Sequence, residues 1–276
     1  MNRDNDSLIE EYFHIALFSM EIGLDYKIPT YSGGLGALAG DILRSCADLS
    51  VPIIAVTLAS NKGHFSQRVD EAGNQTELPM EWRIDDFATI MTPRVSVTIS
   101  DREVKIQAWE YLLRGLEGYQ VPVYLLDTNL FENNSSDREI TSYLYGGDER
   151  YRLSQEIVLG IGGVRMLEAL GHRNIRKYHL NEGHSALVAL ELKKKLRDEH
   201  PEYTDEHISQ LVRKKCIFTT HTPVPAGHDK FPASLVKGLL GGYLEADELA
   251  KICPENELNM TLLALNHSEY INGVAK

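Results

Sequence analysis

Short apolar runs alternate along this chain with longer segments in which apolar residues recur every three or four positions. The short runs have the length of buried strands, and the longer segments have the period of helices with one apolar face. Their alternation predicts an α/β fold, in which helices flank a parallel sheet. The predicted strands are Ile15–Met20, Pro52–Leu58, Val121–Leu126, Tyr178–Leu180 and Cys216–Thr220.

Two of the longer segments are predicted as helices. Tyr151–Leu170 is read as one continuous helix, because its apolar residues fall on a single face. These residues are Leu153, Ile157, Ile161, Val164 and Leu167. Gly183–Arg197 is the second helix, with three consecutive lysines directed at water.

The middle of the chain has a different pattern. Val95–Ile99 and Val104–Trp109 alternate apolar and polar residues on either side of a polar turn, which predicts an antiparallel hairpin. A similar pair is expected around the turn-rich cluster Asp70–Asn74. We therefore expect a single domain over 1–276, with a β-rich insertion at about 63–120.

Charge and composition narrow the classes of partner. The 276 residues carry a formal net charge of -12, which repels polyanions, so nucleic acid and anionic membranes are excluded as partners. A neutral sugar polymer is unaffected. The opening Met1–Asp6 is polar and has no signal-peptide character, and no apolar stretch reaches the length of a membrane span, so we expect a cytoplasmic protein.

The most informative stretch is the glycine-rich segment Pro29–Asp41, which leads directly into a helical pattern. Free N–H groups at such a helix start suit a phosphate or another anion, whereas the alternative is a tight turn whose glycines pack on the sheet. A nicotinamide-binding fingerprint does not fit, because a polar loop separates the first strand from Gly33. A P-loop does not fit either, because Ala37 follows Gly36 where a lysine is required.

In this segment and in others downstream, the chain resembles the α-glucan phosphorylase family, in its shorter bacterial and archaeal form. Each similar block is weak alone, but together they cover nearly the whole chain in the family's order. The blocks are Ser19–Glu21, Tyr31–Gly36, Ala39–Asp41, Asp48–Pro52, Gly63–Arg68, Tyr145–Asp148 with Arg150, Arg152, Gln155 and Glu156, His179–Ser185, Phe218–His228 and Asn259–Ala275.

The resemblance implies a glycosyltransferase fold of the B type (GT-B), in which two Rossmann-like halves face one another across a cleft. It implies an enzyme that splits the terminal α-1,4 bond of a glucan or maltooligosaccharide with inorganic phosphate to give glucose 1-phosphate, with the help of pyridoxal phosphate. The family's segment around the cofactor lysine does not occur in this sequence. We therefore expect the N-terminal half only, no cofactor on this chain alone, and no turnover by it.

The resemblance also assigns roles to individual residues. Gly33 and Gly34 match the loop whose N–H groups contact the substrate phosphate, and Leu35 matches a residue that lies against the sugar ring. His221 matches the catalytic-site histidine that binds the glucose near its 6-hydroxyl. Glu21 matches a glutamate near the catalytic centre, expected to organise the site; its alternative is an exposed cap.

Asn181, Glu182 and His184 match the region that holds the departing glucan. The same residues are also read as a helix start, with Asn181 as the N-cap and Glu182 favoured by the helix dipole. Arg150, Arg152 and Glu156 lie at helical spacings, which are equally typical of an ordinary surface ion pair. No histidine pair has the spacing of a helix-borne zinc site, so no metal is expected.

Two other function classes remain open. Starch and glycogen synthases, which use a nucleotide sugar, carry a similar glycine loop, but normally with a lysine where this chain has Tyr31. The third reading is a non-catalytic module that binds glucan or a partner through an exposed cleft face. The partners that these readings allow are a second copy of the chain in a homodimer, or the missing C-terminal half.

Overall fold

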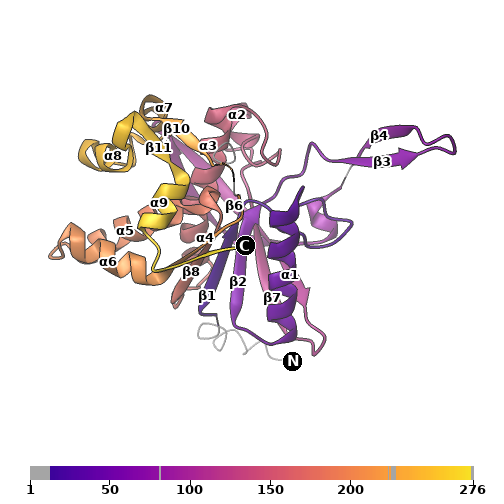
Figure 1. Cartoon of the computed structure of the whole chain (residues 1–276), viewed down its shortest axis with the longest axis horizontal. Coiled ribbons are helices and arrows are strands. Elements are labelled where there is room, and N and C mark those ends of the chain that lie inside the picture. Colours follow the sequence, from indigo (N-terminus) through magenta and orange to yellow (C-terminus); the bar gives the residue numbers. More distant parts are fainter. Residues whose placement is uncertain (1–12, 81, 223, 225–227, 275–276) are drawn as a thin grey trace.

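The computed structural model describes residues 13–80, 82–222, 224 and 228–274 (Figure 1). Its centre is an eight-stranded sheet with the order β12-β9-β8-β1-β2-β7-β6-β5. The strands from β12 to β7 pair in parallel, whereas β7, β6 and β5 pair antiparallel. Their bounds are β1 Ile15–Ser19, β2 Ile53–Leu58, β5 Thr89–Ile99, β6 Arg102–Arg114, β7 Gln120–Asp127, β8 Lys177–Asn181, β9 Cys216–Thr220 and β12 Tyr270–Gly273.

Helices cover both faces of this sheet. Helix α1 lies on one face, and α3, α4 and α5 lie on the other (Figure 1). The strand sequences explain the two layers, because successive side chains point to opposite faces. In β1, Phe18 joins the larger core while Leu17 packs under α1, and in β2 Val56 and Ala55 divide in the same way. The helices are α1 Gly34–Asp48, α2 Ser135–Arg138, α3 Glu149–Ile157, α4 Gly163–Ala169, α5 Leu187–Glu199, α6 Asp205–Lys215, α7 Ala233–Leu240, α8 Ala246–Ile252 and α9 Met260–Asn266.

The α/β architecture predicted from the sequence is confirmed. All five predicted strands are present, and β9 has the predicted bounds. Strand β12 was not predicted. It is a short rim strand whose residues are half-buried or exposed, so it carries no apolar run that would reveal it.

Both helix predictions need correction. A π-turn at Val158–Gly162 divides the predicted helix Tyr151–Leu170 into α3 and α4. A Cβ at Gly160 would lie 2.8 Å from Leu187 Cβ, so this stretch packs backbone against α5. The second prediction begins too early, because Gly183–Ser185 forms a separate 3-10 turn before α5.

The antiparallel pairing of β5 and β6 is confirmed, and this hairpin continues the main sheet rather than standing apart from it. Strand β5 forms the rim, where Pro93 falls inside a register shift between Ile90 and Arg94. The second predicted pair is β3 Phe65–Val69 with β4 Gln75–Pro79, a two-stranded arm that projects from the body (Figure 1). A third small pair joins β10 Lys230–Pro232 to β11 Glu257–Asn259.

Among the described residues, no helix is both long and apolar enough to cross a membrane. The polar opening Met1–Asp6 lies outside the described residues, as do Pro223, Pro225–Gly227 and Ala275 of the resemblance blocks.

Candidate functional site

The carboxyl ends of three neighbouring strands meet at one edge of the sheet. Strands β1, β8 and β9 lie side by side in parallel, so the residues that follow them share this edge. Those residues are Glu21 after β1, Glu182 after β8 and His221 after β9. Crevices at the carboxyl ends of parallel strands are where α/β folds bind ligands. The structure therefore brings together three residues singled out from three distant parts of the sequence.

Glu182 ties the chain that follows β9 to the end of β8. Its Oε2 accepts hydrogen bonds from the backbone N–H groups of His221 at 2.7 Å and Thr222 at 3.0 Å, and from Thr222 Oγ1 at 3.1 Å. Its Oε1 accepts from Thr220 Oγ1 at 3.3 Å and from the N–H of Gly183 at 3.1 Å. The carboxylate is only 2 % exposed, so these bonds compensate its burial.

Glu182 also adopts a backbone conformation that is rare for its residue type, with φ at 70°. Left-handed backbone at a non-glycine residue persists only where the surroundings over-determine it, and it clusters at functional sites. Glu182, and not Asn181, caps the 3-10 turn, which corrects the predicted N-cap. Asn181 is instead the last residue of β8.

The imidazole of His221 has a fixed orientation. Its Nε2 lies 2.7 Å from Asn181 Oδ1, while Asn181 Nδ2 donates to Ser19 Oγ at 2.9 Å. The Ser19 hydroxyl in turn donates to the carbonyl of Glu21 at 2.7 Å. Because the amide oxygen can only accept, Nε2 carries the proton and Nδ1 of the neutral ring is an acceptor. Burial lowers the pKa of His221, which the Glu182 carboxylate partly opposes, so the ring is neutral at pH 7.

Glu21 lies at the mouth of α1 and binds the glycine loop. The carboxylate is 3 % exposed, and its Oε2 accepts from the N–H groups of Ser32 at 2.6 Å and Gly33 at 3.1 Å. It is thus not an exposed cap. Because the Gly33 N–H is engaged by Glu21, the first donors left to an anion at this helix start are those of Gly34 and Leu35, while the next residue, Gly36, is buried.

The glycines of this segment serve two purposes. A Cβ at Gly36 would lie 2.7 Å from Glu21 Oε2, and one at Gly40 would lie 2.1 Å from the carbonyl oxygen of Gly23, so both positions allow close packing. An added Cβ at Gly33 or Gly34 would meet nothing within 4 Å. Gly36 and Gly40 are therefore needed for close packing, whereas Gly33 and Gly34 have open space where a ligand could approach.

His184 belongs to a buried charged cluster beside this edge. The ring is 6 % exposed, and its Nε2 lies 3.2 Å from Asp229 Oδ2 and 3.2 Å from Arg152 Nη2. Arg152 pairs with the same Asp229 oxygen at 2.7 Å. Burial raises the pKa of Asp229, but hydrogen bonding and charge from His184 and the charge of Arg152 outweigh this and lower it well below its usual value.

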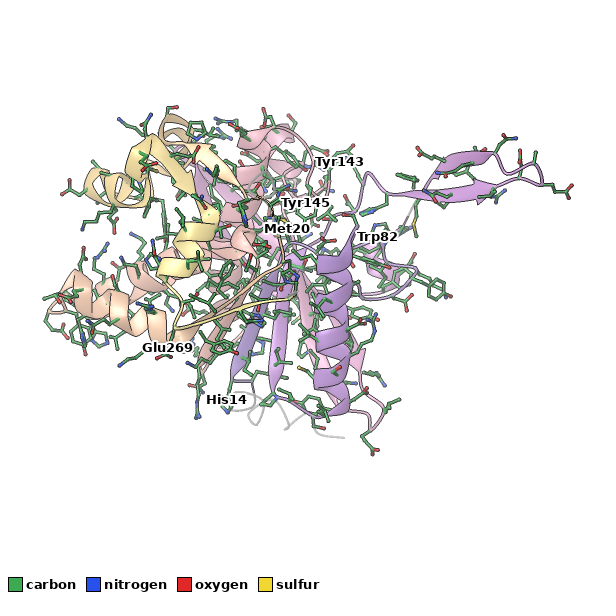
Figure 2. The ribbon with its side chains drawn as sticks, viewed as in Figure 1. His14, Met20, Trp82, Tyr143, Tyr145 and Glu269 are labelled. Carbon is green, nitrogen blue, oxygen red and sulfur yellow. The ribbon has the colours of Figure 1, made fainter. Side chains whose placement is uncertain are left out.

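The structure changes the reading of Arg152 and Glu156. Arg152 Nε lies 3.8 Å from Glu156 Oε1, but Glu156 is fully buried, so this is no ordinary surface pair. Sequence reasoning also missed Asp229 and gave Tyr145 no role, although Tyr145 donates to Glu21 Oε1 at 3.0 Å. Figure 2 labels Tyr145 and Met20 at this end of the sheet. Only the resemblance block around residue 145 signalled this segment.

A hollow of about 630 Å³ opens next to the cluster, lined by Tyr145, Arg152, His228 and Asp229 among others. Two hollows of about 690 and 710 Å³ lie instead around residues that precede β8 and β9, among them Arg173 and Lys215. We place the candidate site at the carboxyl edge, because the buried polar network is there. No group of three metal-ligating side chains occurs within the described part of the chain.

Comparison with curated proteins reveals close relatives over nearly the whole chain. A maltodextrin phosphorylase of Thermococcus litoralis is 39% identical over 93% of this chain. Glycogen phosphorylases of Mycobacterium tuberculosis and Aquifex aeolicus are 36% and 33% identical, each over 95% of it. The chain is homologous to part of the α-glucan phosphorylases. It spans 31%, 33% and 39% of the length of these three phosphorylases, respectively. No protein-family model matches the chain.

Proposed function

We propose that this chain forms the glucan- and phosphate-facing wall of an α-glucan phosphorylase. In this proposal residues 1–276 are the N-terminal, Rossmann-like domain of a GT-B fold, and the substrate lies across the carboxyl edge of the parallel strands. The supporting observation is the linked set at that edge: the open glycine loop, Glu21 and His221, joined through Ser19 and Asn181. A nucleotide-sugar transferase or a plain glucan-binding module has no separate observation in its favour.

Each residue takes a definite part in this proposal. The N–H groups of Gly34 and Leu35, at the positive end of the α1 dipole, receive the substrate phosphate. His221 accepts a sugar hydroxyl at Nδ1, because Asn181 occupies its other nitrogen. A neutral ring suits this role, since a protonated one could only donate.

Other residues of the site hold these groups in place. Glu182 binds two backbone N–H groups of the segment that carries His221, and Glu21 binds two of the glycine loop. We assign Asn181, Glu182 and His184 to the glucan side of the site, where Asn181 and Glu182 act through His221. His184 contacts Arg152 and Asp229, which line the hollow.

The pyridoxal phosphate of the family needs a lysine amine that can form an imine. Lys62, which follows β2 at this edge, is instead paired with Glu139 at 2.8 Å, and its ammonium also lies 5.9 Å from the Tyr143 ring centroid. Lys230, beside the hollow, is paired with Glu257 at 3.1 Å. Neither fits the cofactor's requirement, so we derive no step through pyridoxal phosphate and propose that the isolated chain forms no glucose 1-phosphate.

Calorimetric titration with maltoheptaose tests the binding role. The chain should bind the oligosaccharide, and His221→Ala should weaken binding at least about tenfold, because a hydroxyl partner in a partly desolvated site is lost. His200→Ala is the matched control, since His200 stacks on Tyr203 at the end of α5. Unchanged affinity in His221→Ala would refute the site. Sustained glucose 1-phosphate formation by the chain alone would refute its inactivity.

A further inference from the structure

Tyr145 reaches across the fold to Glu21 from a constrained backbone position. Its hydroxyl donates to Glu21 Oε1 at 3.0 Å, although 124 residues separate the two in sequence. Its φ is 53°, a left-handed value that a bulky side chain rarely adopts. Such a conformation persists where surrounding contacts enforce it. The contacts of Tyr145 therefore indicate what holds it there.

The side chains of Arg152 and His184 both pack against the Tyr145 ring, and we call this pair the clamp. The guanidinium carbon of Arg152 lies 4.4 Å from the ring centroid, in cation–π geometry, and the His184 ring lies 5.3 Å away. Asp229 joins the two clamping residues, since its Oδ2 lies 2.7 Å from Arg152 and 3.2 Å from His184. Asp229 thus anchors both sides of the clamp, which is built from α3, the 3-10 turn after β8, and the chain before β10.

Glu156 is a second carboxyl group next to Arg152 and Asp229. The cluster holds one permanent cation, Arg152, against the two carboxyl groups of Asp229 and Glu156. Glu156 is fully buried, and neither of its oxygens has a hydrogen-bonding partner in the described structure. Its nearest cation is Arg152, 3.8 Å away and already paired with Asp229, so a charged Glu156 would be costly and its protonated form is favoured. Burial, and then the charge of Asp229, raise the pKa of Glu156 well above its usual value.

We propose that Tyr145, clamped by the Arg152–Asp229–His184 cluster, is a positioning residue that sets the Glu21 carboxylate against the glycine loop. A carboxylate has two oxygens, and engaging Oε1 fixes the rotation that presents Oε2 to the N–H groups of Ser32 and Gly33. The loop conformation that exposes the next two N–H groups thereby depends on a tyrosine more than a hundred residues away. Only the relevance to phosphate rests on the proposed function; the positioning stands on geometry.

Amide hydrogen exchange at Ser32 and Gly33, followed by NMR, tests the positioning without any ligand. Tyr145→Phe keeps the clamped ring and removes the hydroxyl. Exchange at both amides should accelerate about tenfold, near the lower end of what a hydrogen bond to a charged group contributes. Tyr143→Phe is the matched control. Tyr143 lies in the same segment and its side chain is exposed, while the Glu21 oxygens accept from Tyr145, Ser32 and Gly33. Equal exchange in Tyr145→Phe and wild type would overturn the proposal.

Two further variants test the clamp and guard against misfolding. Arg152→Lys keeps the charge beside Asp229 but loses the planar group over the ring, so exchange at Ser32 and Gly33 should accelerate by a smaller factor. Glu156→Gln replaces a neutral acid by a neutral amide, so it should leave that exchange unchanged. Faster exchange throughout the sheet in Arg152→Lys, with no selectivity for these amides, would show a merely structural role.

A last measurement separates this inference from the proposed function. Inorganic phosphate is titrated into wild type and Tyr145→Phe while the N–H resonances of Gly34 and Leu35 are observed. Weaker phosphate binding in the variant supports both ideas together. Faster exchange at Ser32 and Gly33 in Tyr145→Phe, with no phosphate binding by either protein, would support the positioning role of Tyr145 and refute the phosphate site.

Discussion

The Nε2 atom of His221 lies 2.7 Å from Asn181 Oδ1, so a strand-end amide decides which imidazole nitrogen faces outward. The orientation of that amide is itself fixed, because its Nδ2 donates to Ser19 Oγ. The ring therefore presents an acceptor at the candidate site, and its protonation state becomes a measurable property of the network.

Replacing Asn181 by aspartate should raise the pKa of His221. Asn181→Asp places a carboxylate where the amide oxygen now accepts from the ring, and an opposite charge at this distance favours the protonated imidazole by about one to three pKa units. NMR titration of the His221 ring protons measures the change. Asn74→Asp, on the projecting β3–β4 arm, adds the same charge elsewhere and should leave the titration unaltered. An equal pKa in Asn181→Asp would contradict the assigned contact.

Truncating Glu182 should destabilise the fold more than its single carboxylate suggests. Glu182→Ala leaves three backbone N–H groups and two hydroxyls at the ends of β8 and β9 without their acceptor, so we expect a loss of roughly 3–5 kcal/mol in the free energy of unfolding. Urea denaturation measures it. Glu117→Ala, at the exposed turn before β7, is the control and should change stability by less than about 0.5 kcal/mol. Similar values for both variants would show that the Glu182 bonds do not form.

The glycine loop offers a matched pair of substitutions. In Gly36→Ala the new Cβ would lie 2.5 Å from Tyr31 Cβ and 2.7 Å from Glu21 Oε2, so about 1–3 kcal/mol of stability should be lost. Gly34→Ala meets nothing within 4 Å and should fold normally, yet it should weaken phosphate binding because its methyl occupies the open mouth of α1. Thermal unfolding and phosphate titration separate the two effects. A fully stable Gly36→Ala protein would refute the close approach of Glu21.

Acid should destabilise the protein partly through His179. Burial, and then the charge of His221, lower the pKa of His179 to about 4. The unfolded chain binds this proton below about pH 6.5, whereas the folded chain resists it, so the unfolded state holds more protons between these values. Stability is therefore present above pH 6.5 and is lost as the pH falls toward 4, by at most about 3 kcal/mol.

The variant His179→Gln isolates this contribution. Glutamine keeps a donor for Thr219 Oγ1, which the histidine Nε2 contacts at 2.8 Å, but it cannot gain a proton. Its free energy of unfolding should change less between pH 6.5 and 4 than that of wild type. The exposed His200, replaced in the same way, is the reference. If the two variants lose stability in parallel with wild type, His179 is not the group that titrates.

The sequence pattern predicted the strands and helices that show a buried apolar run or a helical period. The strands β1, β2, β7, β8 and β9 are buried apolar runs, so their positions were readable. The π-turn at Val158–Gly162 was not, because it keeps helical spacing on both sides and arises from close packing on α5. The short strand β12 was not predicted either. It lies at the edge of the sheet and is largely exposed, so its sequence carries no apolar run.

Some residues of the candidate site could be predicted from the sequence, and others could not. Glu21 and His221 were found because each follows a predicted strand and matches a family block, whereas Glu182 was found because it matches a family block and suits a helix start. The hydrogen bond from Gly33 to Glu21 was not foreseen, since it depends on how the loop folds back over the twelve positions that separate these residues. Asp229 carries no local signal, because its importance comes from pairing with Arg152 across 77 positions of the chain. Contacts of that span are set by topology.

The two rims of the sheet are unequal, and this restricts how the molecule can assemble. At the β5 rim, Pro93 has no N–H to donate and the local register shift interrupts the ladder, so another strand cannot add smoothly there. At the β12 rim, among the described residues, the outward N–H and C=O groups of a parallel strand face no neighbour in the sheet. Growth of the sheet by an added strand is thus directed to one side, next to the edge where His221 lies.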